Sequence, residues 1–487
     1  MVVRELPWRR RVVDRGAPCI APPPDTFMAP LRILAVIGVI GIAAVAGLVI
    51  FAWHSPLAPI VRPEANTFAA GQIKRGAALA ALGDCNTCHT APGGRPFAGG
   101  YGVPTPFGTI YSTNITPDED TGIGRWSEAA FRRALRQGVG RDGSQLYPAF
   151  PYDHFTLLTD DDIGALYAFL MTRQAVSAST PANDLPFPLN VRMVVAGWKL
   201  LFFREGPFQA DPNQDQRWNR GAYLVEGISH CGACHTPRNA LGAENVRDAF
   251  GGGEVEGWTA YALNQNAPAP VPWNADALLT YLRQGWHSEH GVARGPMAPV
   301  IENLLTTPDA DRVSMSAYMA GVMGTPSPDR QRAAAALVAR VENSPPQPYS
   351  AETQASPENA GVLIYQSACA SCHDGGRPPP YGGINLALST GPSGPNARNV
   401  INVVLWGLLA APGERSPIMP GFATVLSDRQ LADLLSYVRS RFSDKPAWTS
   451  VDADIGAVRR NAPAVHVSPA PGTDPAAPAV KEHEAQR

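Results

Sequence analysis

The longest apolar run in the chain lies near its N-terminus, where residues 33–51 carry no charged side chain. A run of this length approaches the ~20 apolar residues that cross a hydrocarbon core of ~30 Å. Six arginines precede it, and this excess of positive charge predicts a cytoplasmic tail at residues 1–30, a transmembrane anchor at 31–53 and an exported remainder. A cleaved signal peptide is the alternative, with a weak cleavage site at residues 44–46.

Amphipathic patterns of helical period recur three times in the rest of the chain. Each recurrence opens with a short apolar-rich stretch and closes with a longer one, in which acidic residues lead into a face of Ala, Leu and Tyr. The opening stretches are residues 71–80, 218–225 and 360–365, and the closing stretches are residues 159–170, 307–319 and 426–438. Thr159 is the expected N-cap of the first closing helix, because its hydroxyl can accept a free backbone N–H. We predict three repeated helical units whose first and last helices pack together.

The fold class that these patterns predict is all-α, with three tandem domains after the N-terminal transmembrane helix. Proline-rich stretches separate the units and set the expected boundaries. The predicted divisions are domain 1 at 65–180, a linker at 181–212, domain 2 at 213–326, a linker at 327–355, domain 3 at 356–445 and a disordered tail at 446–487. Domains of about 100 residues have marginal cores, so a bound apolar group would supply missing contacts.

Residues 191–204, in the first linker, combine apolar residues, one Trp and two Phe with flanking Arg and Lys. This stretch is too short to cross a bilayer. Its composition suits a segment that lies on a membrane surface. Packing between domains is an alternative of equal weight.

Cysteine is scarce, with seven residues in 487, and six of the seven fall in one repeated pattern. The pattern Cys-x-x-Cys-His occurs at Cys85, Cys88 and His89, at Cys231, Cys234 and His235, and at Cys369, Cys372 and His373. It is the attachment signature of c-type haem, in which two thiols bind the porphyrin and the His lies beneath the iron. A zinc site would need a second ligand pair nearby, and a redox dithiol would not need a His each time. We therefore predict three covalently bound haems c.

An iron that only transfers electrons needs a sixth ligand, and Met opposite His is a common one that raises the reduction potential. Met297 and Met419 each stand in a loop stiffened by neighbouring prolines. We predict that they complete the axial pairs with His235 and His373. A Met of the hydrophobic core is the alternative for each.

The first unit lacks such a methionine, because Phe150 stands at the corresponding place and cannot bind iron. His154, four residues further along, is the nearest replacement. His89 and His154 are therefore the predicted axial pair of the first haem. Met171, Met193 and a vacant sixth position stay open as alternatives.

The formal net charge of −2 gives no reason to expect nucleic acid as a partner. The sequence contains no Gly-x-Gly-x-x-Gly after a strand, no P-loop and no metal-hydrolase cluster. We therefore expect a chain that is not catalytic alone and does not bind an organic substrate. A peroxidase-like cytochrome would need an open iron, for which the first haem is the candidate. Two further histidines, His287 and His290, are expected to face solvent.

With these motifs identified, residues 65–445 resemble the cytochrome c subunit of membrane-bound bacterial dehydrogenases. The resemblance rests on three Cys-x-x-Cys-His motifs in one anchored chain, and on residues 105–116, 147–152, 185–190 and 232–239. It implies three class I cytochrome c domains, a location in the inner membrane with the bulk of the chain in the periplasm, and electron transfer from a periplasmic catalytic subunit to ubiquinone.

Two branches of this family fit the sequence. In the alcohol dehydrogenases of acetic acid bacteria, the catalytic partner carries pyrroloquinoline quinone. In the other branch the partners are molybdenum hydroxylases of aldehydes or N-heterocycles, which implies a further partner, a small iron–sulfur subunit. The stretch at residues 150–155 favours the molybdenum branch. An electron donor to a terminal oxidase is a third interpretation.

Overall fold

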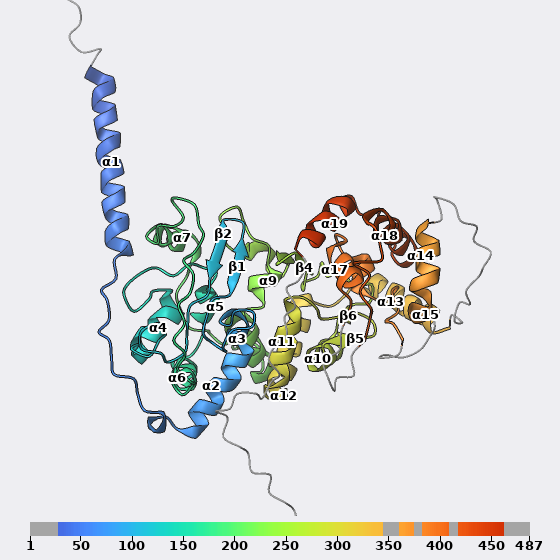
Figure 1. Cartoon of the computed structure of the whole chain (residues 1–487), viewed down its shortest axis with the longest axis horizontal. Coiled ribbons are helices and arrows are strands. Elements are labelled where there is room, and N and C mark those ends of the chain that lie inside the picture. Colours follow the sequence, from blue (N-terminus) through green and yellow to red (C-terminus); the bar gives the residue numbers. More distant parts are fainter. Residues whose placement is uncertain (1–27, 344–359, 375–381, 409–416, 462–487) are drawn as a thin grey trace, which may run out of the picture. The chain divides into compact units, whose positions relative to one another are not determined.

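The computed structural model describes residues 28–343, 360–374, 382–408 and 417–461, and Figure 1 shows their helices and strands. The chain divides into two compact units, one ending at Trp53 and one beginning at His54. The leftover cysteine, Cys19, and most of the tail predicted to be disordered lie outside the described residues.

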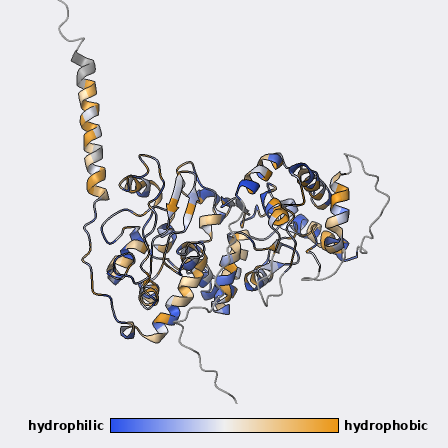
Figure 2. Cartoon of the chain, viewed as in Figure 1, coloured by the Kyte–Doolittle hydropathy of each residue, from blue (hydrophilic) through white to orange (hydrophobic). Residues whose placement is uncertain are grey.

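Helix α1 (Met28–Ala52) is the described element of the first unit. Its segment Ile33–Ala52 has a mean hydropathy of 2.9 and is long and apolar enough to cross a membrane. Figure 2 shows hydrophobic residues along this helix. The finding agrees with the predicted anchor, and a signal sequence would meet the same criteria of length and composition.

Three helix pairs organise the second unit, and in each pair an early helix packs against a later one. The pairs are α2 (Ala70–Leu82) with α6 (Asp160–Met171), α8 (Gln216–Ala222) with α12 (Asp309–Met323), and α14 (Ala360–Ala368) with α18 (Asp428–Phe442). The predicted contact between the first and last helices of each repeat is confirmed. The predicted N-cap is confirmed as well, since Thr159 Oγ1 accepts the Asp162 N–H at 3.2 Å.

A glycine lies at the crossing point of each helix pair. An added Cβ would lie within about 2 Å of a backbone oxygen of the partner helix: 1.9 Å from Ala165 O for Gly76, 2.1 Å from Ser314 O for Gly221, and 2.1 Å from Asp433 O for Gly361. The early helices therefore approach their partners at a residue that has no side chain. The sequence Arg-Gly-Ala occurs at both of the first two glycines, at residues 75–77 and 220–222, and this packing explains its glycine.

Apart from α13 (Pro328–Asn343), which has 16 residues, the remaining elements are short. The other helices are α3 (Cys85–Cys88), α4 (Glu128–Gln137), α5 (Tyr152–Phe155), α7 (Val194–Phe202), α9 (Gly232–His235), α10 (Ala275–Gln284), α11 (Met297–Leu305), α13 (Pro328–Asn343), α15 (Ala370–His373), α16 (Thr390–Ser393), α17 (Arg398–Trp406) and α19 (Val451–Arg460), with η1 (Ala65–Thr67), η2 (Tyr223–Ile228) and η3 (Val246–Asp248). Antiparallel hairpins pair β1 (Gly102–Thr105) with β2 (Gly108–Tyr111), β3 (Gly253–Val255) with β4 (Trp258–Ala260), and β5 (Trp286–His287) with β6 (Gly291–Val292). The described part is mostly helical, as predicted, and these hairpins are its departure from an all-α chain.

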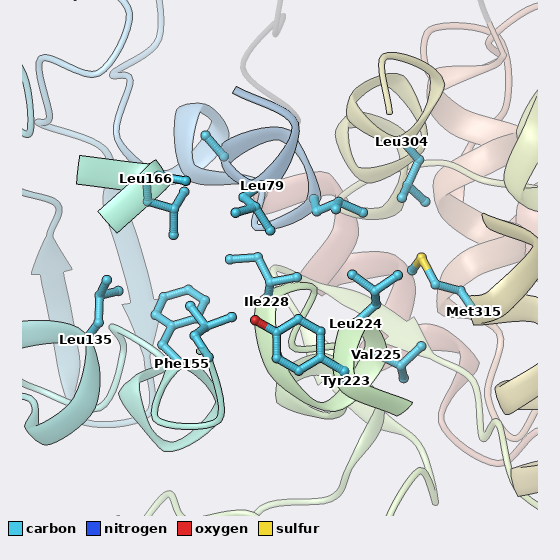
Figure 3. Packing of buried hydrophobic residues seen from close by; sticks show 14 of the residues in the cluster. Leu79, Leu135, Phe155, Leu166, Tyr223, Leu224, Val225, Ile228, Leu304 and Met315 are labelled. Carbon is cyan, nitrogen blue, oxygen red and sulfur yellow. The ribbon is translucent and has the colours of Figure 1, made fainter. Parts of the chain in front are cut away.

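Buried hydrophobic side chains form two clusters. The larger extends from Leu79 to Met323 and includes side chains of the first two helix pairs. Figure 3 shows Leu79, Ile228 and Leu304, from α2, η2 and α11, converging in this cluster. The smaller cluster contains residues from Tyr365 to Val458. The first two helix pairs therefore share one core, and the third pair has a core of its own.

Several stretches expected to be linker or tail contain helices. Helix α7 lies in the first expected linker, α13 lies in the second, and α19 lies in the tail predicted to be disordered. In α19, Ile455 and Val458 are 1% and 4% exposed, and Asp454 accepts a hydrogen bond from Arg398 Nε at 2.8 Å. The composition of the tail as a whole suggested disorder, but its first residues carry apolar side chains at helical spacing that pack on α17 and α18.

Substitution of Gly76 tests the helix crossing. Gly76→Ala is expected to lower the free energy of unfolding by about 1–3 kcal/mol, the usual cost of overpacking. Gly71, on the same helix, is the matched control, because an added Cβ there meets nothing within 4 Å. Gly71→Ala is expected to be neutral or to stabilise by up to ~1 kcal/mol. Chemical denaturation of the haem-loaded variants measures both values, and equal effects would show that the crossing is not tight.

Candidate functional site

Each Cys-x-x-Cys-His motif forms one helical turn close after the early helix of its pair. The N–H of the motif histidine donates to the carbonyl of the first motif cysteine, at 2.9 Å in the first motif and 3.0 Å in the other two. The turn brings both cysteines and the histidine, at positions i, i+3 and i+4, onto one face. All six motif cysteines are free thiols, as attachment of a porphyrin requires.

The ring Nδ1 atoms of His89, His235 and His373 each donate a hydrogen bond to a backbone carbonyl. The acceptors are the carbonyl oxygens of Thr113, Tyr261 and Ile384, at 2.7, 2.7 and 2.8 Å respectively. Because a carbonyl can only accept, the ring proton resides on Nδ1 and Nε2 keeps its lone pair. Burial lowers the pKa of all three imidazoles and so favours the neutral ring. A neutral imidazole held by its other nitrogen is the form that ligates a metal.

Glycines allow the acceptor loops to approach the motifs. An added Cβ would lie 2.4 Å from the Thr113 carbonyl carbon for Gly99, 2.4 Å from Cys234 O for Gly253, and 2.6 Å from His373 Nδ1 for Gly383. These glycines belong to no motif that the sequence shows. Their role depends on which segments meet in space, and the sequence around them carries no signal for that.

The motif thiols do not favour the competing interpretations. Burial raises the pKa to about 12 for Cys85 and Cys231, and to about 11 for Cys234 and Cys369. Zinc and disulfide chemistry both need the thiolate. Among the described residues, no group suited to holding a metal ion includes a motif cysteine. The arrangement fits haem attachment better than a zinc site or a redox dithiol.

A glycine with positive φ precedes each expected sixth-ligand position. The glycines are Gly138, Gly285 and Gly407, with φ of 61°, 75° and 75°. Twelve residues after them stand Phe150, Met297 and Met419, respectively. The first two loops close alike, with the Leu146 N–H donating to Gly138 O at 2.8 Å and the Ala293 N–H donating to Gly285 O at 2.7 Å. Phe150 therefore stands at the place of the methionines in the other two segments.

The two methionines lie at the edges of the cores. Met297 begins α11 and packs against the larger cluster. Met419 packs against the smaller cluster and exchanges backbone hydrogen bonds of 2.8 and 2.9 Å with Leu408. Both side chains are half-buried. These positions suit axial ligation, which stays a prediction for both residues.

His154, the predicted sixth ligand of the first haem, has hydrogen-bond partners at both ring nitrogens, and axial ligation stays a prediction for this residue. It is 7% exposed, its Nδ1 donates to Glu226 O at 2.6 Å, and its Nε2 donates to Glu244 Oε1 at 2.9 Å. Both ring nitrogens are thus engaged by residues that flank the second motif. An added Cβ on Gly232 of that motif would lie 3.2 Å from His154 Cε1. Helix α5 packs on η2, and this packing gives His154 a long-range ionic partner, Glu244, that the sequence did not indicate.

Of the two histidines expected to face solvent, His290 does not, and the structure corrects that expectation. His290 is 4% exposed, and its ring stacks on Trp273 with 3.5 Å between centroids and an interplanar angle of 15°. The His290 carbonyl accepts the Thr390 N–H at 3.2 Å. Helix α16, from the third segment, therefore contacts this hairpin, and local sequence spacing cannot show such a contact. His287 is partly exposed.

The first and second motifs lie against one another. His230, directly before Cys231, donates from Nε2 to Gly83 O at 3.3 Å. An added Cβ on Gly83 would lie 3.0 Å from Ile228 Cδ1 and 3.4 Å from Cys85 Sγ. Residues that flank the two motifs therefore make direct contact.

The loop after the second motif also contacts the third segment. The Thr259 N–H donates to Asn399 Oδ1 at 2.8 Å, and Arg398 pairs with Glu254 at 2.5 Å. The same loop contains Tyr261, whose carbonyl accepts the hydrogen bond of the second motif histidine. Residues around the second motif thus contact the first motif's surroundings and helix α17 of the third segment.

Covalent haem needs two thiols and a neutral imidazole on one face, in a small helical framework that shields them. Each motif provides this set with nearly the same hydrogen-bond distances. The fold and the site together define a c-type cytochrome.

Comparison with known proteins agrees with this class. A family model for cytochrome c matches residues 73–174, and the model described as cytochrome c oxidase, cbb3-type, subunit III matches residues 356–438. The chain is 44% identical to a nicotinate dehydrogenase subunit of Pseudomonas putida over 413 residues, which are 84% of this chain and 34% of that protein. It therefore spans about a third of the length of that relative.

Other relatives are similar over most of their own length. The fructose dehydrogenase cytochrome subunit of Gluconobacter japonicus is 37% identical over 405 residues, which are 78% of this chain and 81% of that protein. The cytochrome c subunit of alcohol dehydrogenase (quinone) from Gluconobacter oxydans is 33% identical over 407 residues, 80% of this chain and 82% of that protein. The chain belongs to the family of cytochrome c subunits of membrane-bound dehydrogenases, and it is an electron-transfer subunit.

The His154–Glu244 pair is expected to make stability depend on pH. Burial opposes the charged ring, but the hydrogen bond and charge of Glu244, with the charge of Asp153, outweigh it and raise the pKa of His154 to about 9. Because this pKa exceeds the ordinary value of 6.5, the stabilisation is full below about pH 6.5 and is lost as pH rises through 9. His154→Gln should therefore lower the free energy of unfolding by about 2–4 kcal/mol near pH 6, at ~1.4 kcal/mol per pKa unit. It should also flatten the dependence of that free energy on pH between 6.5 and 9.

Denaturant unfolding at several pH values measures this effect. Glu244→Gln, which removes the other half of the pair, should flatten the pH dependence of the free energy of unfolding over the same range. The absorption spectrum of each haem-loaded variant is recorded alongside. A changed axial-ligand spectrum in His154→Gln would support the predicted ligand role of this residue.

Phe150→Met tests whether Phe150 occupies the position that corresponds to Met297 and Met419. A methionine at this place is expected to bind the first iron, giving a new methionine–iron absorption band and raising one of the potentials by a fraction of the roughly 0.8 V range that axial ligands set. Phe155→Met is the control, since Phe155 contacts the Phe150 ring at 5.4 Å between centroids but stands at another position. Spectroelectrochemical titration compares the two. Identical titrations of Phe150→Met and wild type would refute the equivalence.

Proposed function

We propose that this chain holds three haems c, one at each motif, in three tandem class I cytochrome c domains, and passes electrons from a periplasmic dehydrogenase to ubiquinone. The observation that carries the proposal is the threefold repeat of a thiol pair beside an imidazole whose Nδ1 is bonded to a backbone carbonyl. The three helix crossings at glycine support the same repeat.

The residues of the chain have distinct roles in this proposal. Bound haem would supply one-electron oxidation and reduction. The motif cysteines would attach it, and the Nε2 atoms of the motif histidines would face the iron. Met297 and Met419 would hold the sixth positions of the second and third sites. The first site has Phe150 there, so it is proposed to have the lowest potential of the three.

The proposed catalytic partner is a molybdenum hydroxylase of N-heterocycles or aldehydes, with a small iron–sulfur subunit. Its support is the 44% identity to a relative named as part of a nicotinate dehydrogenase, since nicotinate is an N-heterocycle. A dehydrogenase that contains pyrroloquinoline quinone and oxidises alcohols is the second candidate. It is favoured by length, because this chain covers 82% of the alcohol dehydrogenase relative from Gluconobacter oxydans but 34% of the nicotinate dehydrogenase one.

The proposed location is the inner membrane, with α1 as the anchor and the second unit in the periplasm. Its support is the apolar segment Ile33–Ala52 and the arginines before it. The word quinone in the names of several relatives supports ubiquinone as the acceptor.

Haem number is tested by mass. The purified chain is expected to exceed its polypeptide mass by three haems, and the haem stain should persist on a denaturing gel. Replacing both cysteines of one motif, as in Cys369→Ser with Cys372→Ser, should remove one haem. Its control is Cys19→Ser, outside the motifs, which should remove none. A wild-type mass with fewer than three haems would overturn the assignment of one haem to each motif.

The partner and acceptor are tested on the complex purified from membranes. Mass spectrometry is expected to identify a molybdenum-binding and an iron–sulfur subunit, and nicotinate or an aldehyde should reduce the haems and then added ubiquinone. A co-purifying protein with pyrroloquinoline quinone, and reduction by ethanol, would select the second candidate. Haem oxidation by a terminal oxidase with no quinone reduction would contradict the proposed acceptor.

A further inference from the structure

Helix α7 is apolar on both of its faces. On the inner face, Val195 and Ala196 are 6% and 0% exposed, whereas on the opposite face Leu200 and Leu201 are 51% and 63% exposed. A helix that is hydrophobic all round is normally buried in protein or in lipid. Contiguous exposed apolar residues of this kind mark an interaction surface.

The exposed side, called here the outer face, comprises Val194, Gly197, Leu200 and Leu201. An added Cβ on Gly197 would meet no atom within 4 Å, so this side is open. Val191 and Met193, just before the helix, are 43% and 37% exposed and extend the apolar surface. The helix itself contains no acidic residue.

The inner face fixes α7 firmly to the second unit. Lys199 is 8% exposed, and its Nζ donates to Gln137 O, Gly138 O and Gln145 Oε1 at 2.6, 2.8 and 2.7 Å. The Trp198 Nε1–H donates to Leu241 O at 3.0 Å. A buried ammonium with three acceptors holds the helix in one orientation, and the outer face stays exposed in that orientation.

The loop at residues 138–146, which supplies acceptors for Lys199, also binds the residues that begin the second unit. The side-chain oxygen of Gln145 accepts a hydrogen bond from Lys199, and its Nε2 lies 3.3 Å from the ring Nδ1 of His54. The Leu57 N–H donates to Arg141 O at 2.8 Å in the same loop. His54 follows Ala52, the last residue of α1, by two positions, and a residue spans at most ~3.6 Å. The chain that leaves α1 is therefore bonded, two residues later, to the loop that also binds Lys199 of α7.

We propose that α7 lies on the lipid surface of the membrane, with its outer face in contact with acyl chains. The proposal rests on the membrane anchorage proposed above for α1. Aromatic and leucine side chains with flanking basic residues are the composition of helices that lie in a membrane interface. Arg192 and Arg204, at the two ends of the segment, suit anionic headgroups. The short covalent path to α1 favours lipid over a protein partner as the occupant.

The experiment uses the full haem-loaded chain with a protease site inserted between Trp53 and His54, at the boundary of the two units. The protein is reconstituted into vesicles of phosphatidylethanolamine and phosphatidylglycerol, cut, and sedimented. The cut wild-type second unit is expected to stay with the vesicles. In the double variant Leu200→Asp with Leu201→Asp, the bound fraction of the cut unit should fall at least fivefold. Its control is Val246→Asp with Val425→Asp, at residues 81% and 68% exposed outside α7, which should bind like wild type.

The outcomes separate α7 from α1. Release of the cut wild-type unit, or equal binding by the double variant with an unchanged haem spectrum, overturns the proposal for α7. Retention of the cut unit only when the catalytic partner protein is present assigns the outer face to a protein and also overturns it. The uncut double variant reports on α1 alone. If uncut wild type sediments with the vesicles and the uncut double variant does not, α1 is not an anchor and the role of α7 stands.

Discussion

The hydrogen bond from the Nδ1 of each motif histidine to a backbone carbonyl is the constraint on which the site depends. It fixes the ring proton, and it leaves Nε2 with a lone pair directed away from the acceptor. The acceptor must come from a loop outside the motif, and that loop must pass close to the cysteines. Glycines at Gly99, Gly253 and Gly383 make these approaches possible. A motif of five residues thus sets requirements on segments that lie well beyond it in the chain.

The helix crossings impose a second constraint of the same kind. Each early helix carries a glycine where a side chain would collide with the backbone of its partner, so the two helices come close and orient the motif that follows. The first two helix pairs then share a single hydrophobic cluster, whereas the third has its own. Small helical domains have little core each, and joining two of them increases the apolar area that both can bury.

The three sites share a backbone plan but differ in the groups around them. Phe150 replaces the methionine of the other two loops, and His154 pairs with Glu244 beside the second motif. The second motif touches the surroundings of both others, through His230 on one side and through the Thr259 loop on the other. Residues near the second motif thus contact both the first motif and the third segment, and differences in axial ligation offer a way to give haem sites different potentials.

The sequence alone determined the chemistry of attachment, the apolar N-terminal segment and the pairing of first and last helices in each repeat. The first two follow from local spacing and composition, since Cys-x-x-Cys-His fits one helical turn, whereas the helix pairing was inferred from the threefold recurrence of opening and closing patterns. The correspondence of Phe150 with Met297 and Met419 could also be inferred from the sequence, because it depends on the number of residues that separate each from a preceding glycine.

Only the tertiary structure decided which groups surround those local features. It selected Thr113, Tyr261 and Ile384 as acceptors, turned His154 toward Glu244, and buried His290 against Trp273. It also ordered α19, in a stretch whose composition suggested disorder, by burying Ile455 and Val458. In each case the partner lies far away in sequence or belongs to another segment. Local spacing fixes which atoms a residue offers, whereas packing between distant segments fixes which atoms it meets.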